Sequence, residues 1–143
     1  MISILDIKKV INSKLSDIED VKVYGNEVKE GFERPSFFVQ LFMENNDLFS
    51  YSVTENFIIV EIVYFSKENT QLDNLKMYEK LKKSFSSPLE LDNRKILPQK
   101  IRADFNDVLS FKFNLNFYDD AYIEKEKLEP IDNIELDINM KGK

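Results

Sequence analysis

The sequence predicts an α+β fold: a mainly antiparallel, twisted sheet of about four to six strands with two helices packed on it. Three observations carry this prediction. Two stretches, near the N-terminus and in residues 70–85, repeat apolar side chains at the spacing of an amphipathic helix. Residues 57–65 form the most apolar and β-prone run of the chain. Residues 108–118 alternate apolar with polar side chains, as a half-buried strand does.

The first helix is expected from Ile4 to Leu15. Ser3 followed by Asp6 has the form of a capping box variant. The apolar residues of this helix fall on one face: Ile4, Ile7, Ile11 and Leu15. A short strand, Val21 to Tyr24, follows and ends at Gly25, as a strand that leads into a turn does.

A second strand is expected from Ser36 to Met43, because the fixed φ and missing N–H of Pro35 suit the start of a strand. Its two faces alternate: Phe37, Val39, Leu41 and Met43 on one, and Phe38, Gln40, Phe42 and Glu44 on the other. The residues that follow tolerate a left-handed backbone: Asn45, Asn46 and Asp47. They predict a hairpin turn that projects from the sheet and is mobile in a free subunit, with a second arm in residues 48–54.

Phe57 to Phe65 is expected to be the central strand, with both faces in need of cover because only Glu61 interrupts its apolar run. A second helix is expected from Thr70 to Phe85, with Asn69 or Thr70 as its cap, and Pro88 ends it. One stripe of this helix is expected to face the sheet: Leu72, Leu75, Tyr78, Leu81 and Phe85.

A turn at Asp92 and Asn93 leads into a short extended piece, Arg94 to Leu97. Residues 101–105 and 108–118 then predict a hairpin. Its second arm should point one row of side chains inward: Leu109, Phe111, Phe113, Leu115 and Phe117.

The net charge of −6 lies near the C-terminus, because residues 119–137 hold eight acidic residues against two lysines. We therefore predict an α+β domain in residues 1–118 and an acidic segment in residues 119–143. Alternating apolar residues after Pro130 suggest that this segment ends in a last strand or a docking arm: Ile131, Ile134, Leu136 and Ile138. A solvated tail is the plainer interpretation. An acidic segment repels phosphates, so no sequence-specific binding of nucleic acid is predicted.

The side-chain chemistry argues against an enzyme. The chain has no histidine or cysteine, which excludes the usual nucleophile pairs and thiolate metal sites, and its three glycines are too scattered for a phosphate loop. The remaining catalytic candidates are carboxylates: Asp104 with Asp107, Asp119 with Asp120, and Glu61. Such pairs arise by chance in an acidic chain, so no catalytic residue, metal or cofactor is predicted. Glu61 is expected to pair with an arginine: Arg34, Arg94 or Arg102.

The stretch from Val21 to Val39 carries a resemblance to a known family. It rests on an N-terminal helix, a short strand, a turn and a second strand, with these residues in order: Tyr24-Gly25, then Gly31-Phe32-x-x-Pro35-x-Phe37-Phe38. This order resembles a family of phage tail terminator proteins, found in tailed phages, prophages and phage-tail-like bacteriocin clusters of low-GC Gram-positive bacteria. The resemblance is strongest up to about residue 65 and looser beyond it.

The resemblance implies a structural function. Such proteins form a ring, typically hexameric, that caps the finished tail tube, stops its polymerisation and offers the attachment surface for the head or neck. The implied partners are further copies of the chain, the tail tube protein, and the sheath and neck or head-completion proteins. The implied location is the host bacterial cytoplasm during assembly and then the tail of the particle. No cofactor or turnover is implied, and no apolar stretch reaches the roughly 18 residues of a membrane span.

Two helices cannot cover both faces of so apolar a sheet, so part of it is expected to meet a partner. The candidate subunit or partner contacts are Phe32, Arg34, Phe38, Phe42, Asn45, Asn46, Asp47, Glu124, Glu126 and Glu129. In a ring, the acidic segment would lie on the outer or end surface, which we favour, or line the channel. The alternative function is a small acidic monomeric protein-binding module or inhibitor. Size-exclusion chromatography with light scattering separates the two.

Overall fold

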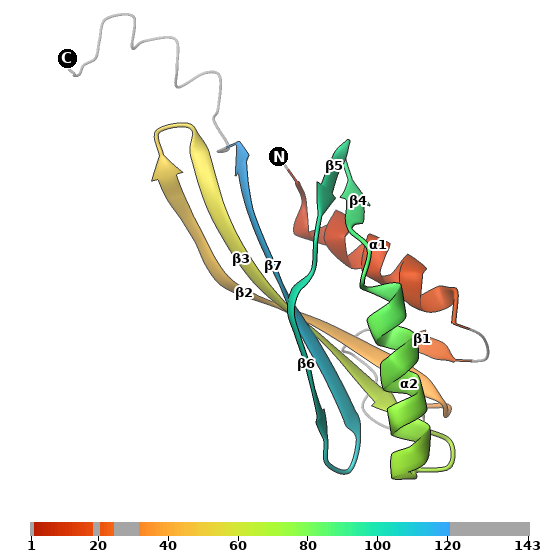
Figure 1. The fold of residues 1–143 in the computed structure, drawn as a ribbon. Helices are drawn as coiled ribbons and strands as arrows, with labels where there is room; N and C mark the ends of the chain where they lie inside the picture. Colours follow the sequence, from red (N-terminus) through yellow and green to blue (C-terminus); the bar gives the residue numbers. More distant parts are fainter. Residues whose placement is uncertain (1, 19–20, 25–31, 121–143) are drawn as a thin grey trace, which may run out of the picture.

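The computed structural model describes residues 2–18, 21–24 and 32–120 of the chain (Figure 1). Two helices and a mostly antiparallel sheet confirm the predicted α+β class. The elements, in chain order, are α1 (Ile4–Ser16), β1 (Lys22–Tyr24), β2 (Ser36–Ser50), β3 (Val53–Phe65), α2 (Gln71–Ser84), β4 (Leu89–Leu91), β5 (Arg94–Ile96), β6 (Gln99–Phe105) and β7 (Leu109–Asp120).

The main sheet has five strands in the order β1-β2-β3-β7-β6, and β4 pairs with β5 in a separate two-stranded sheet. β1 runs parallel to β2, and the other pairs in the main sheet are antiparallel. β3 is the central strand, as predicted, and Val60 lies between Leu41 of β2 and Phe113 of β7. Figure 1 shows both helices on one side of this sheet.

The core lies between the helices and one face of the sheet. From β3 it takes Ile58, Val60, Ile62 and Tyr64. From β7 it takes the predicted inward row, all buried: Leu109, Phe111, Phe113, Leu115 and Phe117. Fully burying one such side chain stabilises the fold by about 1.5–3 kcal/mol, so these two strands supply much of the driving force for folding.

α1 begins where the capping residue predicts. The Ser3 hydroxyl accepts a hydrogen bond from the Leu5 N–H at 3.2 Å, which satisfies one of the donors that a helix start leaves free. Three of the four predicted apolar positions are buried: Ile7, Ile11 and Leu15. The fourth, Ile4, is 37% exposed, because the first turn of α1 only partly reaches the sheet.

α2 starts after Thr70, whose hydroxyl accepts from the Asp73 N–H at 3.2 Å. The predicted buried stripe is confirmed at Leu81 and Phe85 and wrong at the first two leucines. Leu72 and Leu75 are 62% and 44% exposed, whereas the buried residues of the helix are Asn74, Met77 and Leu81. At about 100° per residue, the five predicted positions spread over half of the helix circumference, and only one side can face the sheet. The side that does so is set by the C-terminal half of α2, where Leu81 is followed by the buried Phe85.

The predicted hairpin turn at residues 45–47 is also wrong. β2 continues to Ser50, and the turn falls at Tyr51 and Ser52. β2 continues past a register shift between Met43 and Asn45. Beyond the shift, the three predicted turn residues pair with β3: Asn45 with Phe57, Asn46 with Asn56, and Asp47 with Glu55. The amide of Asn46 donates to the Asn56 side chain. The Asn45 amide also donates to the Glu55 carboxylate, so two of the three residues have side-chain partners on β3, and these contacts with the strand pairing outweigh the local preference for a turn.

Two other turns form where the sequence predicts them. Asp92 and Asn93 have φ of 51° and 66° between β4 and β5, which is the left-handed backbone that two-residue hairpin turns require. The β6–β7 hairpin forms as predicted. β7 runs on to Asp120, and residues 121–143, which include most of the acidic segment and its predicted last strand, lie outside the described residues.

Candidate interaction surface

The β2–β3 hairpin extends beyond the helices, together with the end of β7 (Figure 1). The lengths of the elements explain this: the 13 residues of α1 span about 20 Å as a helix, while the 15 residues of β2 span about 50 Å as a strand. We call residues 47–55 and 118–120 the hairpin end. Since α1 cannot cover the whole strand, no helix among the residues that the structure describes lies over the hairpin end.

Large apolar and aromatic side chains gather on the hairpin end. Leu48 is 68% exposed, Phe49 63% and Tyr51 78%, and Tyr118 on β7 is 49% exposed. Scattered apolar residues are ordinary on a protein surface, but several together on one projection mark a contact site. Met43 and Phe42, on opposite faces of β2, are 44% and 48% exposed and carry apolar surface on each face toward the body of the sheet.

Contacts across the strands hold part of this surface in place. The rings of Phe49 and Tyr118 pack edge to face, with centroids 5.0 Å apart. The Tyr118 hydroxyl donates to the Glu55 carboxylate at 3.1 Å, and this hydrogen bond raises the pKa of the tyrosine. The side chains are thus presented by paired strands rather than by a loop.

A groove of about 360 Å³ separates the start of α1 from the inner side of the hairpin. Its apolar lining comes from α1, β2, β3 and β7: Ile4, Ile7, Met43, Ile58 and Phe117. Asn46 and Asn56, which bond to each other, lie at the same groove. A groove of this size and lining fits one or two apolar side chains of a partner.

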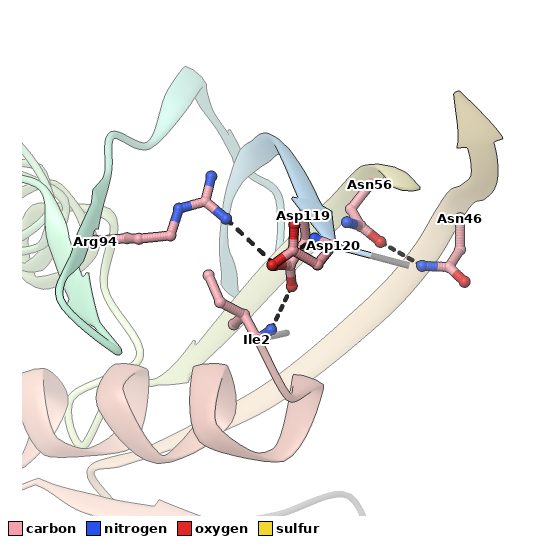
Figure 2. A network of polar contacts seen from close by, with 6 residues as sticks. All are labelled: Ile2, Asn46, Asn56, Arg94, Asp119 and Asp120. Carbon is pink, nitrogen blue, oxygen red and sulfur yellow. Dashed lines mark hydrogen bonds and ion pairs between the residues drawn. The ribbon is translucent and has the colours of Figure 1, made fainter. Parts of the chain in front are cut away.

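Asp119 closes one side of the groove (Figure 2). Its side chain is 8% exposed, accepts a hydrogen bond from the Ile2 N–H, and lies 3.5 Å from the Arg94 guanidinium. Arg94 also lies over the Phe117 ring, 5.7 Å from its centroid. Asp119 therefore ties the chain before α1 and the strand β5 to the end of β7, which makes it a structural residue rather than half of a catalytic pair.

A second aromatic cluster lies at the other end of β2, on the sheet face away from the helices. It joins Tyr24, Phe32, Phe38 and Phe65, whose ring centroids lie 4.9–6.5 Å apart in the contacting pairs. The Arg34 guanidinium lies 5.5 Å from the Phe32 ring centroid and donates to the Ser66 carbonyl at 3.0 Å. Three predicted contact residues, Phe32, Arg34 and Phe38, thus pack within one subunit, and their role between subunits stays a prediction.

Glu61 does not pair with an arginine. Its carboxylate accepts a hydrogen bond from the Ser110 hydroxyl at 2.6 Å, and it lies opposite Lys112 in the β3–β7 register. The three candidate arginines have other partners: Arg34 bonds to Ser66, Arg94 to Asp119, and Arg102 to Lys100 and Asn114. The prediction was wrong because Ser110 on the adjacent strand β7 bonds to the Glu61 carboxylate, while each of the three arginines has another partner.

The other acidic candidates lie on the surface. Asp104 and Asp107 are exposed on and beside β6. Within residues 2–18, 21–24 and 32–120, no three acidic side chains gather where they could hold a metal ion. Among the same residues, no helix has the length and apolarity to cross a membrane. Glu124, Glu126 and Glu129 lie outside the described residues.

A family model described as phage tail terminator protein matches residues 6–129, which is most of the chain. The chain belongs to the phage tail terminator family. The match begins in α1 and extends past the end of β7, so it includes the hairpin end of this terminator. Membership gives the protein a structural role in a phage tail, where it contacts other tail components.

No curated protein sequence matches this terminator. One solved structure, known only by a sequence identifier, aligns with 86% of this chain and 99% of its own at 11% identity, with a TM-score of 0.42. A likeness at that level does not indicate a shared function.

Sequence reasoning missed the most exposed side chains of the site, Leu48, Phe49 and Tyr51, and of the predicted contact residues only Asp47 lies on the hairpin end. Asn45, Asn46 and Phe42 lie on β2 beside it. If the turn had been placed at Tyr51 and Ser52, the predicted second strand would have been much longer than the first helix, and this difference would have indicated an uncovered end.

Proposed function

We propose that this tail terminator assembles as a ring, in the form of a hexamer, on the end of the finished tail tube. The ring stops the tube from growing and offers the surface to which the head or neck attaches. Its assembly takes place in the host bacterial cytoplasm, and the protein performs no catalysis and needs no cofactor. Its partners are further copies of itself, the tail tube protein, and the sheath and neck or head-completion proteins.

The hairpin end supports this proposal most strongly. It presents Leu48, Phe49 and Tyr51 to solvent on paired strands. A monomeric protein gains no stability from side chains held in this way, whereas an assembly buries them. The exposed apolar surface is therefore what a protein with a structural role in an assembly requires.

The acidic segment adds a second element to the proposal. β7 delivers the chain to residue 121 from the hairpin end, beside Asp119 and Asp120. We place the segment on the outer or end surface of the ring, where its charge would guide a basic neck or sheath protein. Partner docking should then weaken as salt is raised.

Light scattering over a range of concentrations, followed by electron microscopy of tube ends, tests the ring. The protein should form rings when it is concentrated or when tail tube is added, and cap density should appear on the tubes. A protein that stays monomeric on both counts, and leaves tube ends bare, supports the monomeric binding module instead.

A further inference from the structure

The outward face of α2 is apolar at its start and basic along its length. Leu72 and Leu75 are 62% and 44% exposed near the N-terminus of the helix. Four exposed lysines follow: Lys76, Lys80, Lys82 and Lys83. The whole helix holds these four against two acidic residues, and one of those two, Asp73, accepts a hydrogen bond from Tyr64. We call the two leucines and four lysines the α2 face.

The hairpin end has the opposite charge. β2 and β3 together hold four acidic residues and no lysine or arginine. Asp47 and Glu55 face each other across the two strands on the hairpin end, and Glu44 precedes them on β2. Asp120 is exposed at the end of β7. The exposed apolar side chains of the hairpin end thus have acidic neighbours, while the outward side of α2 carries four lysines against one exposed glutamate, Glu79, and is basic in balance.

The two surfaces lie at opposite ends of the molecule. α2 follows Phe65, the last residue of β3, while the hairpin end contains Val53, the first residue of the same strand. The 13 residues of β3 span about 43 Å. Figure 1 shows the start of α2 and the hairpin end at opposite ends of the long strands of the sheet. A contact between two different surfaces so far apart must be made between copies, and it repeats head to tail.

We propose that the hairpin end of one copy docks on the α2 face of the next. Leu48, Phe49 and Tyr51 contact Leu72 and Leu75, and the acidic rim of the hairpin end faces the lysines of the helix. The occupant of the α2 face is therefore a second copy of this chain, chosen by apolar character and by charge complementarity. This inference rests on the proposed ring and names the contact that builds it.

Disulfide cross-linking tests the contact, because the chain contains no cysteine of its own. A Phe49→Cys protein is mixed with a differently tagged Leu72→Cys protein and oxidised mildly. The expected product is a disulfide dimer that carries both tags. Asn106→Cys, at the exposed β6–β7 turn, replaces Leu72→Cys as the matched control, and its yield should be about tenfold lower.

A charge exchange then tests the chemistry of recognition. Lys76→Glu with Lys83→Glu should lower the cross-link yield about tenfold, because like charges then face each other. Glu44→Lys with Asp47→Lys on the opposing copy should restore it. Lys95→Glu, at an exposed position on β5, is the control and should leave the yield unchanged.

The results separate this contact from the ring itself. Rings on tube ends without the mixed disulfide would overturn the docking of the hairpin end on α2 and leave the proposed function standing. Loss of the cross-link with Lys76→Glu and Lys83→Glu, restored only by basic replacements at Glu124 and Glu126, would show that the acidic segment supplies the charge opposite the lysines, which overturns the charge pairing assigned to the hairpin end. The absence of both rings and caps would refute the proposed function.

Discussion

Replacing Asp119 by asparagine should lower the free energy of unfolding by about 2–3 kcal/mol. The Asp119 side chain is 8% exposed, and its carboxylate accepts the Ile2 N–H and pairs with Arg94 at 3.5 Å. A hydrogen bond to a buried charged group contributes about 1.5–3 kcal/mol. The Arg94 side chain is 40% exposed, so the ion pair adds no more than about 1 kcal/mol. At this chain length the loss corresponds to a fall of about 5–10 °C in Tm.

Thermal unfolding followed by circular dichroism measures this effect. Asp120→Asn is the matched control, because Asp120 is the exposed neighbour and its change should move Tm by less than about 2 °C. Equal Tm values for wild type and Asp119→Asn would show that this carboxylate does not tie the start of α1 and β5 to β7. A large shift in the control would show instead that charge at the end of β7, and not the contacts of Asp119, controls stability.

Three further predictions concern the helix α2, the pH dependence and the acidic segment. In chemical denaturation, Leu81→Ala should lower the free energy of unfolding by about 2–5 kcal/mol, and Leu75→Ala on the same helix by less than about 1 kcal/mol. Equal losses would contradict the buried side assigned to α2. Burial, with the hydrogen-bonded Asp73, raises the pKa of Tyr64 from 10.0 to about 12. The unfolded chain therefore loses this proton first, so the free energy of unfolding should be intact below pH 10 and fall as pH rises from 10 to 12. The fall should be smaller in Tyr64→Phe. Glutamine at Glu124, Glu126 and Glu129 should weaken the docking of a basic neck or sheath partner and reduce the salt dependence of this docking, without loss of rings. Unchanged docking would contradict the location of the acidic segment on the outer or end surface of the ring.

Much of the fold follows from short-range signals in the sequence. The row of β7 from Leu109 to Phe117 alternates without interruption, so its buried face could be predicted. Ser3 and Thr70 are side chains that favour helix starts, and both cap a helix. The turn at Asp92 and Asn93 needed only residues that accept a positive φ.

The failures share a physical cause, which is that distant partners override local preference. Asn45, Asn46 and Asp47 favour a turn by themselves, but Phe57, Asn56 and Glu55 on β3 hold them in a strand. The buried side of α2 depends on where the helix meets the sheet, and this cannot be predicted from Leu72 and Leu75 at the start of the helix. The hairpin end depends on the relative lengths of α1 and β2, and hence on a turn position that the local sequence misplaces.

The most direct test of the central claim is the length of tail tubes assembled with and without this protein. Tube protein is allowed to polymerise, terminator is added part-way, and tube lengths and ends are recorded by electron microscopy at successive times. Growth should stop on addition, and a ring should be seen at the tube end. Tubes that continue to lengthen at the same rate, with no density at their ends, would contradict this claim.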